Sequence, residues 1–184
     1  MSVADRARRA ELMWAAGDGE GALDQLLLGI AATSRKRYPK STVPGDGEAF
    51  VRFVEDEIRS GLFFGPHVTE VNFAMPWRGK SVSLAEILYQ IRCSTVHEGA
   101  LPADVHYAPG GEPHLLVLRI DDTTGAFVFQ DTLLRCLDRC VHNVPENATE
   151  LDPLPVASYT GPSVTSGPGG PYTVTASIIE LAII

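Results

Sequence analysis

The sequence predicts a mainly α-helical protein, a four- to five-helix bundle with a small β-hairpin and an extended C-terminal tail. Two observations predict it. Apolar residues recur every three or four positions over most of the first 148 residues. After that, prolines and glycines alternate too densely for a helix. We therefore expect a helical domain over residues 1–148, with the hairpin at about 114–130, and a Pro/Gly-rich extended tail over residues 149–184.

Three helices are expected first, over about residues 3–16, 20–37 and 47–60. Their apolar positions are Leu12, Met13 and Trp14, then Leu23, Leu26, Leu27, Ile30 and Ala31, then Phe50, Val54 and Ile58. The second helix has cations in its last turn, Arg35 to Arg37, which complement the helix dipole, and Pro39 ends it. Asp46 stands at the N-cap position of the third helix.

A fourth helix follows Ser83, because Ser83 and Glu86 have the spacing of a capping box. Gly99 stands where its C-cap would be. Its apolar stripe is Leu84, Ile87, Leu88 and Ile91. This helix should therefore present one face to the core.

The hairpin is predicted from two apolar runs, 115–118 and 126–129, that flank the turn-forming stretch 121–125. A last helix follows at about 131–142, with four positions facing inward: Leu133, Leu134, Leu137 and Val141. The β-prone stretch 172–179 is expected to dock as an edge strand on this chain or a second copy, or to be ordered by packing contacts alone.

Composition narrows the function classes. The chain has 184 residues, 45% of them hydrophobic and 21% charged, which is typical of a globular protein. No apolar run is long enough for a membrane helix, and the N-terminus has no signal-peptide pattern. Three cysteines fit a reducing cytoplasm. The net charge of −8 excludes non-specific coating of nucleic acid, so any contact with RNA needs a local site or a partner.

The residues with the clearest chemical meaning are Arg92 and His97, at the end of the fourth helix. Histidine can exchange protons near neutral pH, because its ordinary pKa is about 6.5. A guanidinium can hold a phosphate through two hydrogen bonds. On an ideal helix, however, residues five positions apart are about 140° apart around the axis. The two side chains would therefore share a site only if the helix ended or bent between them, or if two chains met.

The stretch from Arg92 to Gly99 resembles the signature of the HEPN family of all-α proteins. In these proteins an Arg and a His, separated by four to six residues, lie on the third main helix of a four- or five-helix bundle. The similarity extends over about residues 20–142. It implies a HEPN-like bundle in which two Arg–His pairs line one cleft of a homodimer.

The resemblance also implies an activity, that of a metal-independent endoribonuclease of the toxin or phage-defence kind, with RNA and an antitoxin as partners. His97 would then be the general acid or base, and Arg92 would bind the phosphate. Ser94, Thr95 and Glu98 are candidates for supporting this pair.

A second hypothesis is a non-catalytic HEPN-like module that dimerises or binds RNA, a nucleotide or a protein. Cys93 favours it, since ribonuclease members most often have Asn, Asp or His after the Arg. The retained Arg–His pair favours the enzyme. A purely structural role is the third alternative, with His97 at the negative end of the helix dipole and Arg92 bonded to Glu98 or another acid.

Two further groups have a structural and a functional interpretation. Arg35, Lys36, Arg37 and Tyr38 are either a solvated helix end or an electropositive patch for RNA. Cysteines are among the most buried residues, so packing in the core is favoured over metal binding for Cys136, Cys140 and His142 on the last helix. We therefore expect no metal and no cofactor.

Overall fold

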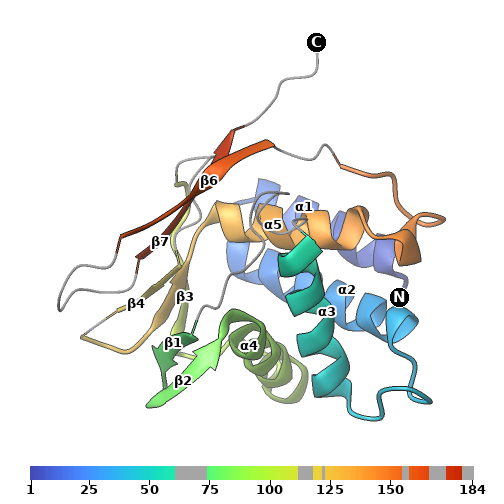
Figure 1. Ribbon diagram of the computed structural model, residues 1–184, viewed down its shortest axis with the longest axis horizontal. Coiled ribbons are helices and arrows are strands. Elements are labelled where there is room, and N and C mark those ends of the chain that lie inside the picture. Colours follow the sequence, from blue (N-terminus) through green and yellow to red (C-terminus); the bar gives the residue numbers. More distant parts are fainter. Residues whose placement is uncertain (61–73, 112–117, 122, 155–157, 166–172, 180–184) are drawn as a thin grey trace.

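The computed structural model describes residues 1–60, 74–111, 118–121, 123–154, 158–165 and 173–179. In this part, the protein is mainly helical with small β-sheets, as the sequence predicts. Figure 1 shows the helices gathered on one side and the strands on the other. The α-helices are α1 (Val3–Ala15), α2 (Gly19–Arg37), α3 (Asp46–Ser60), α4 (Leu84–Glu98) and α5 (Asp131–His142), followed by a short 3-10 helix, η1 (Pro145–Asn147).

Helix α2 is the centre of the helical part, because it packs against α1, α3, α4 and α5 (Figure 1). Its predicted apolar positions Leu23, Leu26, Leu27 and Ile30 are at most 1% exposed. A Cβ on Gly29 would lie 3.5 Å from Val141 of α5, an ordinary packing distance, so the two helices contact each other directly there. Burial against several helices holds α2 in place.

Helix α1 corrects one sequence prediction. We expected Leu12 on its apolar face, but Leu12 is 64% exposed. The buried face is instead formed by Val3, Ala7 and Ala10, whose spacing follows one side of the helix. Small side chains on this side allow close packing on α2, so burial is decided by backbone proximity as well as by side-chain size.

The predicted ends of α4 are confirmed. The backbone N–H of Glu86 donates to the Ser83 hydroxyl, and the N–H of Ser83 donates to the Glu86 carboxylate. Gly99 ends the helix in the left-handed conformation, with φ of 73°. The stripe from Leu84 to Ile91 is buried. Helix α4 is therefore unbroken from its cap to Glu98.

The predicted hairpin is confirmed where it is described, as β4 (Leu118–Ile120) antiparallel to β5 (Phe127–Phe129). Asp121 stabilises its turn by accepting the backbone N–H groups of Thr123 and Thr124. The sequence did not predict β3 (Val105–Tyr107), which pairs with β5 in parallel. Residues 112–117, which include the start of the predicted hairpin, lie outside the described residues.

A second hairpin, β1 (Ala74–Trp77) and β2 (Lys80–Ser83), was also not predicted. Its turn has positive φ at both central residues, 50° at Arg78 and 73° at Gly79. This is the turn that suits a two-residue hairpin. Trp77 is buried 6.4 Å from the ring of Phe127, so both small sheets and the helices share one core.

The predicted C-terminal tail contains a hairpin of its own, β6 (Ser158–Thr165) paired antiparallel with β7 (Thr173–Ile179). The strand expected at about 172–179 therefore pairs within this chain, and β7 lies beside β4 (Figure 1). Strands β6 and β7 form a two-stranded sheet that is separate from the other two sheets.

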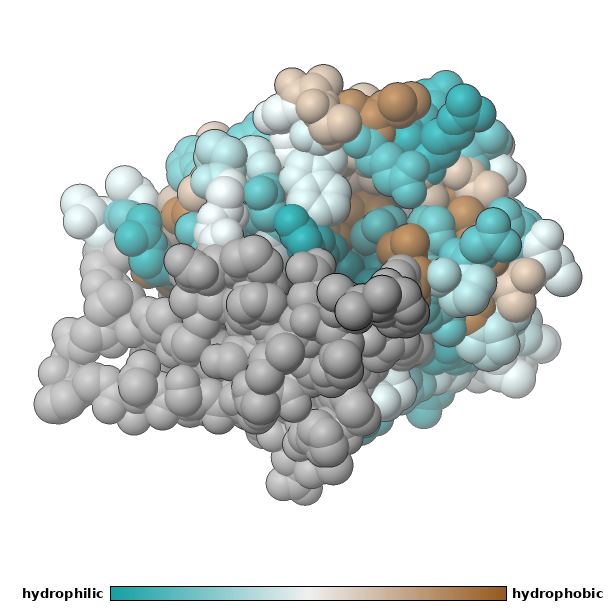
Figure 2. Space-filling view, turned by 90° about the horizontal axis from the view of Figure 1, so that it is seen from above, coloured by the Kyte–Doolittle hydropathy of each residue, from teal (hydrophilic) through white to brown (hydrophobic). Residues whose placement is uncertain are grey.

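The described surface is mixed in character. On the face that Figure 2 shows, hydrophobic described residues occur in small areas among hydrophilic ones. Met1, Leu12 and Val96 are the exposed large hydrophobic residues among those described. None of the described helices is both long and apolar enough to cross a membrane.

Candidate functional site

Helix α4 separates the two residues of the predicted Arg–His pair. Arg92 is half-buried, whereas His97 is exposed in the last turn. Because α4 continues without a break through both residues, the two side chains leave it in different directions. Within one chain, they do not form the shared site that the HEPN resemblance implies.

Arg92 instead lines a pocket to which four helices contribute. The pocket has a volume of about 270 Å³. Its lining comprises Met1 and Arg6 at the N-terminus and in α1, Leu28, Ala31, Ala32 and Arg35 of α2, Asp46 and Phe50 of α3, and Tyr89 and Arg92 of α4. Three arginines thus border this pocket, whereas Asp46 is the one carboxylate in its lining.

The arginines differ in how they are neutralised. Arg35 donates from Nε to Asp46 Oδ1 at 2.7 Å, and this hydrogen bond lowers the pKa of the Asp46 carboxyl. Arg35 also donates to the carbonyl oxygen of Val43 at 2.6 Å. Arg6 and Arg92 form no ion pair with any described residue, and Arg92 Nε is buried without a hydrogen-bond partner. Beside the pocket, two guanidinium groups therefore have no ion-pair partner in the part of the chain that the structure describes.

Tyr89 brings an aromatic ring to the same pocket. Its ring lies 5.6 Å from that of Phe50, and a Cβ on Gly47 would approach it to 2.8 Å. A hydrogen bond with Cys93 raises the pKa of Tyr89, and partial burial adds to the effect. Cys93, at the position after Arg92, thus interacts with Tyr89 one turn earlier in the helix.

The residues expected to support the pair contribute little to this pocket. Thr95 donates its hydroxyl to the carbonyl oxygens of Ile91 and Arg92, inside its own helix. Ser94 is half-buried and Glu98 is exposed, and neither lines the pocket. The structural alternative of an Arg92–Glu98 ion pair is not found among the described residues either.

The basic run at the end of α2 is mostly occupied by other contacts. Lys36 pairs with Glu150 at 2.5 Å and donates to Asn147 Oδ1 at 2.9 Å. Arg37 pairs with Glu57 and Glu146, and the hydroxyl of Tyr38 donates to Asp56. Of the four RNA-binding candidates, Arg35 alone reaches the pocket.

The two cysteines of α5 are core residues, as favoured from the sequence. Cys136 and Cys140 are 0% and 2% exposed, and burial raises the pKa of both thiols. His142 faces another direction, because residues two positions apart lie about 200° apart around a helix. Its Nδ1 lies 2.8 Å from the carbonyl oxygen of Asp152. The Cys–Cys–His metal set considered from the sequence is therefore not assembled.

Sequence reasoning missed the contribution of Arg6 and Tyr89. Arg6 belongs to a short basic run, Arg6, Arg8 and Arg9, of the kind that usually lies on a solvated helix surface. A signal was present, because Arg6 lies three residues after Val3 and four before Ala10, both on the buried face. An arginine beside a buried stripe is a candidate for a site at the edge of the core.

Comparison with known proteins identifies a family. The Rv1289 family model matches residues 2–153. The chain belongs to the Rv1289 family. No curated protein and no solved structure matches the chain.

The Rv1289 match contains all five α-helices and ends before β6. Every lining residue of the pocket except Met1 therefore falls within the family's region. The match provides no link to the HEPN proteins, so that resemblance stays a prediction.

Proposed function

We propose that this protein binds a phosphate-bearing small ligand, a nucleotide, in the pocket that Arg6, Arg35 and Arg92 border. The observation that carries the proposal is the charge of the pocket. Arg6 and Arg92 have no carboxylate partner among the described residues, although the chain carries a net charge of −8. A positive pocket in an acidic protein concentrates anionic ligands at one place.

The chemistry of the guanidinium groups favours phosphate. An arginine offers donors in a planar fork that matches two phosphate oxygens. Arg92 Nε is buried and lacks an acceptor, and leaving such a donor unpaired costs about 1–3 kcal/mol. Arg92 also lines the pocket, so a phosphate there would meet the same guanidinium.

The size of the pocket supports a single nucleotide over a stretch of RNA. Its volume of about 270 Å³ is near the lower end of the range for small-molecule sites, about 300–1,000 Å³. Tyr89 in the lining offers an aromatic face, on which a base can stack. The pocket thus combines phosphate donors with a stacking partner.

Binding is favoured over RNA cleavage by the position of His97. A metal-independent ribonuclease needs a proton-transferring group near the phosphate, but His97 does not line the pocket that holds Arg92. Cleavage would require a second chain to supply the histidine. The HEPN-like bundle, the homodimer and the toxin or phage-defence role remain predictions from the resemblance.

Titration calorimetry with inorganic phosphate and with adenosine and uridine 5′-monophosphates tests the proposal. We expect one nucleotide per chain, with Arg6→Gln and Arg92→Gln each weakening the affinity about tenfold or more, since a charged hydrogen bond contributes about 1.5–3 kcal/mol. Arg8→Gln is the matched control, because Arg8 is exposed on the same helix and does not line the pocket. Equal affinities for all three variants would refute the proposal.

Incubation of the protein with mixed RNA in EDTA separates binding from cleavage. The proposal predicts no cleavage by the wild type. Cleavage that leaves 2′,3′-cyclic phosphate ends and is lost in His97→Ala would instead favour the ribonuclease.

A further inference from the structure

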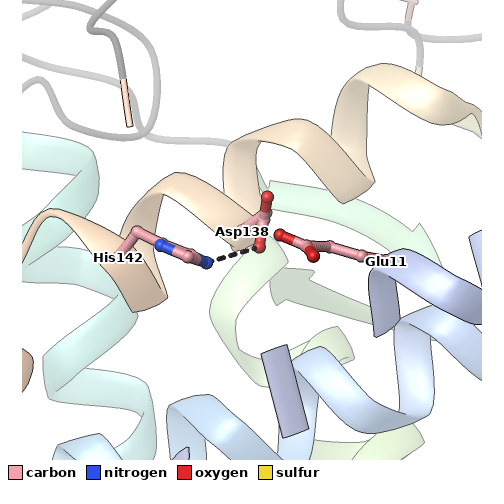
Figure 3. A group of neighbouring side chains, drawn as sticks. All are labelled: Glu11, Asp138 and His142. Carbon is pink, nitrogen blue, oxygen red and sulfur yellow. Dashed lines mark ion pairs between the residues drawn. The ribbon is translucent and has the colours of Figure 1, made fainter. Parts of the chain in front are cut away.

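Three side chains that could bind a metal ion meet between α1 and α5, outside the pocket. Asp138 and His142 are four residues apart on α5 and so lie on one side of that helix, and Glu11 reaches them from α1 (Figure 3). One ligand atom from each of the three residues lies within 4.8 Å of the others.

The hydrogen bonding of His142 leaves its Nε2 free to bind a metal. Its Nδ1 lies 2.8 Å from the carbonyl oxygen of Asp152, which can only accept, so Nδ1 carries a proton. In the neutral ring Nε2 then presents a lone pair toward Asp138 and Glu11 (Figure 3). A backbone carbonyl bonded to the other ring nitrogen is the usual support of a metal-binding histidine.

The cluster is short of hydrogen-bond partners. His142 Nε2 and Asp138 Oδ1 are buried without a hydrogen bond, although the two side chains are only 9% and 13% exposed. The distance between these atoms is 3.5 Å, too long for a hydrogen bond. Burial raises the pKa of the Asp138 carboxyl to about 6, the charges of His142 and Arg139 act to lower it, and the negative charge of Glu11 raises it. A metal ion bound to His142 Nε2 and Asp138 Oδ1 would give both atoms the partner that they lack among the described residues.

We propose that Glu11, Asp138 and His142 bind a divalent first-row transition-metal ion. The distance fits: two ligand atoms that are each about 2.1 Å from one ion lie about 3.4 Å apart in tetrahedral geometry, compared with 3.5 Å here. One imidazole and two carboxylates suit Zn²⁺, Mn²⁺ or Fe²⁺ rather than Ca²⁺, which prefers oxygen ligands alone.

Three protein ligands leave one or more coordination positions open. Open positions are typical of catalytic zinc sites, whereas structural zinc sites have four protein ligands. Glu11 is exposed, so the open side of the site faces solvent. The site therefore has access for water or for an anionic group, independently of the nucleotide proposed for the pocket.

The test is titration of metal-stripped protein with Zn²⁺, and with Mn²⁺ as the second probe. We expect one ion per chain. Glu11→Gln should weaken the affinity about tenfold or more, because even the partners of metal ligands contribute about 10–100-fold. Glu11 is exposed, so this variant should fold as the wild type does, which urea unfolding without metal checks. Glu20→Gln is the matched control, since Glu20 is an exposed glutamate outside the cluster.

Two results would overturn the proposal. The first is the absence of saturable binding of both ions, which would leave Asp138 and His142 as a simple ion pair. The second is equal affinity in Glu11→Gln and Glu20→Gln. Co²⁺ gives an independent readout, because the proposed nitrogen and oxygen ligands give visible absorption without the intense near-ultraviolet band of thiolate ligation. Such a band would assign the metal to cysteine and contradict the site.

Discussion

Cations gather at two places along α2, and their surroundings differ. At the C-terminal end of the helix, Lys36 and Arg37 pair with Glu150, Glu57 and Glu146. Beside the pocket, Arg6 and Arg92 form no ion pair with any described residue. Cations thus link neighbouring segments through ion pairs in one region, and in the other they are the groups that we propose bind a ligand.

The difference shows that charge in the sequence is a poor guide to a binding site. The basic run at residues 35–38 is the more prominent feature of the sequence, yet acids from α3 and the segment after α5 neutralise most of it. Arg6 and Arg92 stand far apart in the sequence, and they become a site only because α1 and α4 both border the pocket. The proposal therefore rests on cations without an ion-pair partner among the described residues, rather than on the number of cations.

The largest expected effect is a loss of stability when Arg37, at the C-terminal end of α2, is replaced. Arg37 Nη1 lies 2.5 Å from Glu57 Oε1, and the Glu57 side chain is 3% exposed. Arg37→Gln would leave this carboxylate buried without its cation, so we expect the free energy of unfolding to fall by about 3 kcal/mol at pH 7. Urea unfolding measures it, and nucleotide affinity should not change.

Arg59→Gln is the control for this prediction. Arg59 also pairs with two acids, Glu55 and Asp56, but its side chain is 64% exposed. Solvent-exposed pairs of this kind contribute about 0.2–1 kcal/mol. A loss in Arg37→Gln no larger than that in Arg59→Gln would contradict a structural role for the end of α2.

The second prediction concerns Arg92, beside the pocket, where we expect a loss of nucleotide affinity instead of a loss of stability. Arg92→Gln removes a guanidinium that forms no ion pair with any described residue and whose Nε is buried without an acceptor, so we expect the free energy of unfolding not to fall. Nucleotide affinity should fall about tenfold or more. Calorimetry and urea unfolding of the same preparation give both values. A loss of stability without a loss of affinity would make Arg92 a structural residue.

A change of opposite sign is expected at Asp46. Asp46→Asn removes the carboxylate from the lining and releases Arg35, so phosphate affinity should rise about threefold, or about 0.7 kcal/mol, a typical size for one nearby charge in water. Asparagine keeps the shape of the side chain. Calorimetry with nucleotide measures the change, and an unchanged or weaker affinity would show that charge does not control binding.

The smallest effect concerns a paired cation at the small sheets. Arg78 donates to both carboxylate oxygens of Asp104, at 2.6 and 2.7 Å, and this lowers the pKa of the Asp104 carboxyl. A lowered carboxyl pKa stabilises the folded protein above the unfolded value of about 3.9, and the contribution is lost as the pH falls through the lower folded value.

The variant Asp104→Asn tests this sign. It should cost less than about 1 kcal/mol at pH 7, because the pair is partly exposed. The difference from wild type should shrink as the pH falls below about 3.9 and through the lowered folded value. A difference that grew as the pH fell would contradict the assigned sign.

Local signals made much of the fold predictable. The Ser83–Glu86 capping box and Gly99 gave both ends of α4, and the turn at 121–125 gave the β4–β5 hairpin. Strand β3 was not predicted, because it has only three residues and pairs in parallel with β5, a contact that no local pattern encodes. The β1–β2 turn at Arg78 and Gly79 is also short, and its arginine is unusual at positive φ.

The candidate site was only partly predictable. Arg92 was selected from the sequence, but as half of a pair with His97, and the unbroken helix α4 separates the two. Two further residues that line the pocket with Arg92 are Arg6, from α1, and Tyr89, three positions earlier in α4. Tertiary packing of α1 against α2 decides that neighbourhood, and side-chain spacing along one helix does not encode it.

A crystal structure of the protein with adenosine 5′-monophosphate tests the central claim most directly. We predict a phosphate oxygen within about 3.2 Å of the Arg92 guanidinium, with Arg6 contacting the same phosphate. A nucleotide bound at saturating concentration elsewhere on the molecule, with no phosphate contact to Arg92, would contradict it.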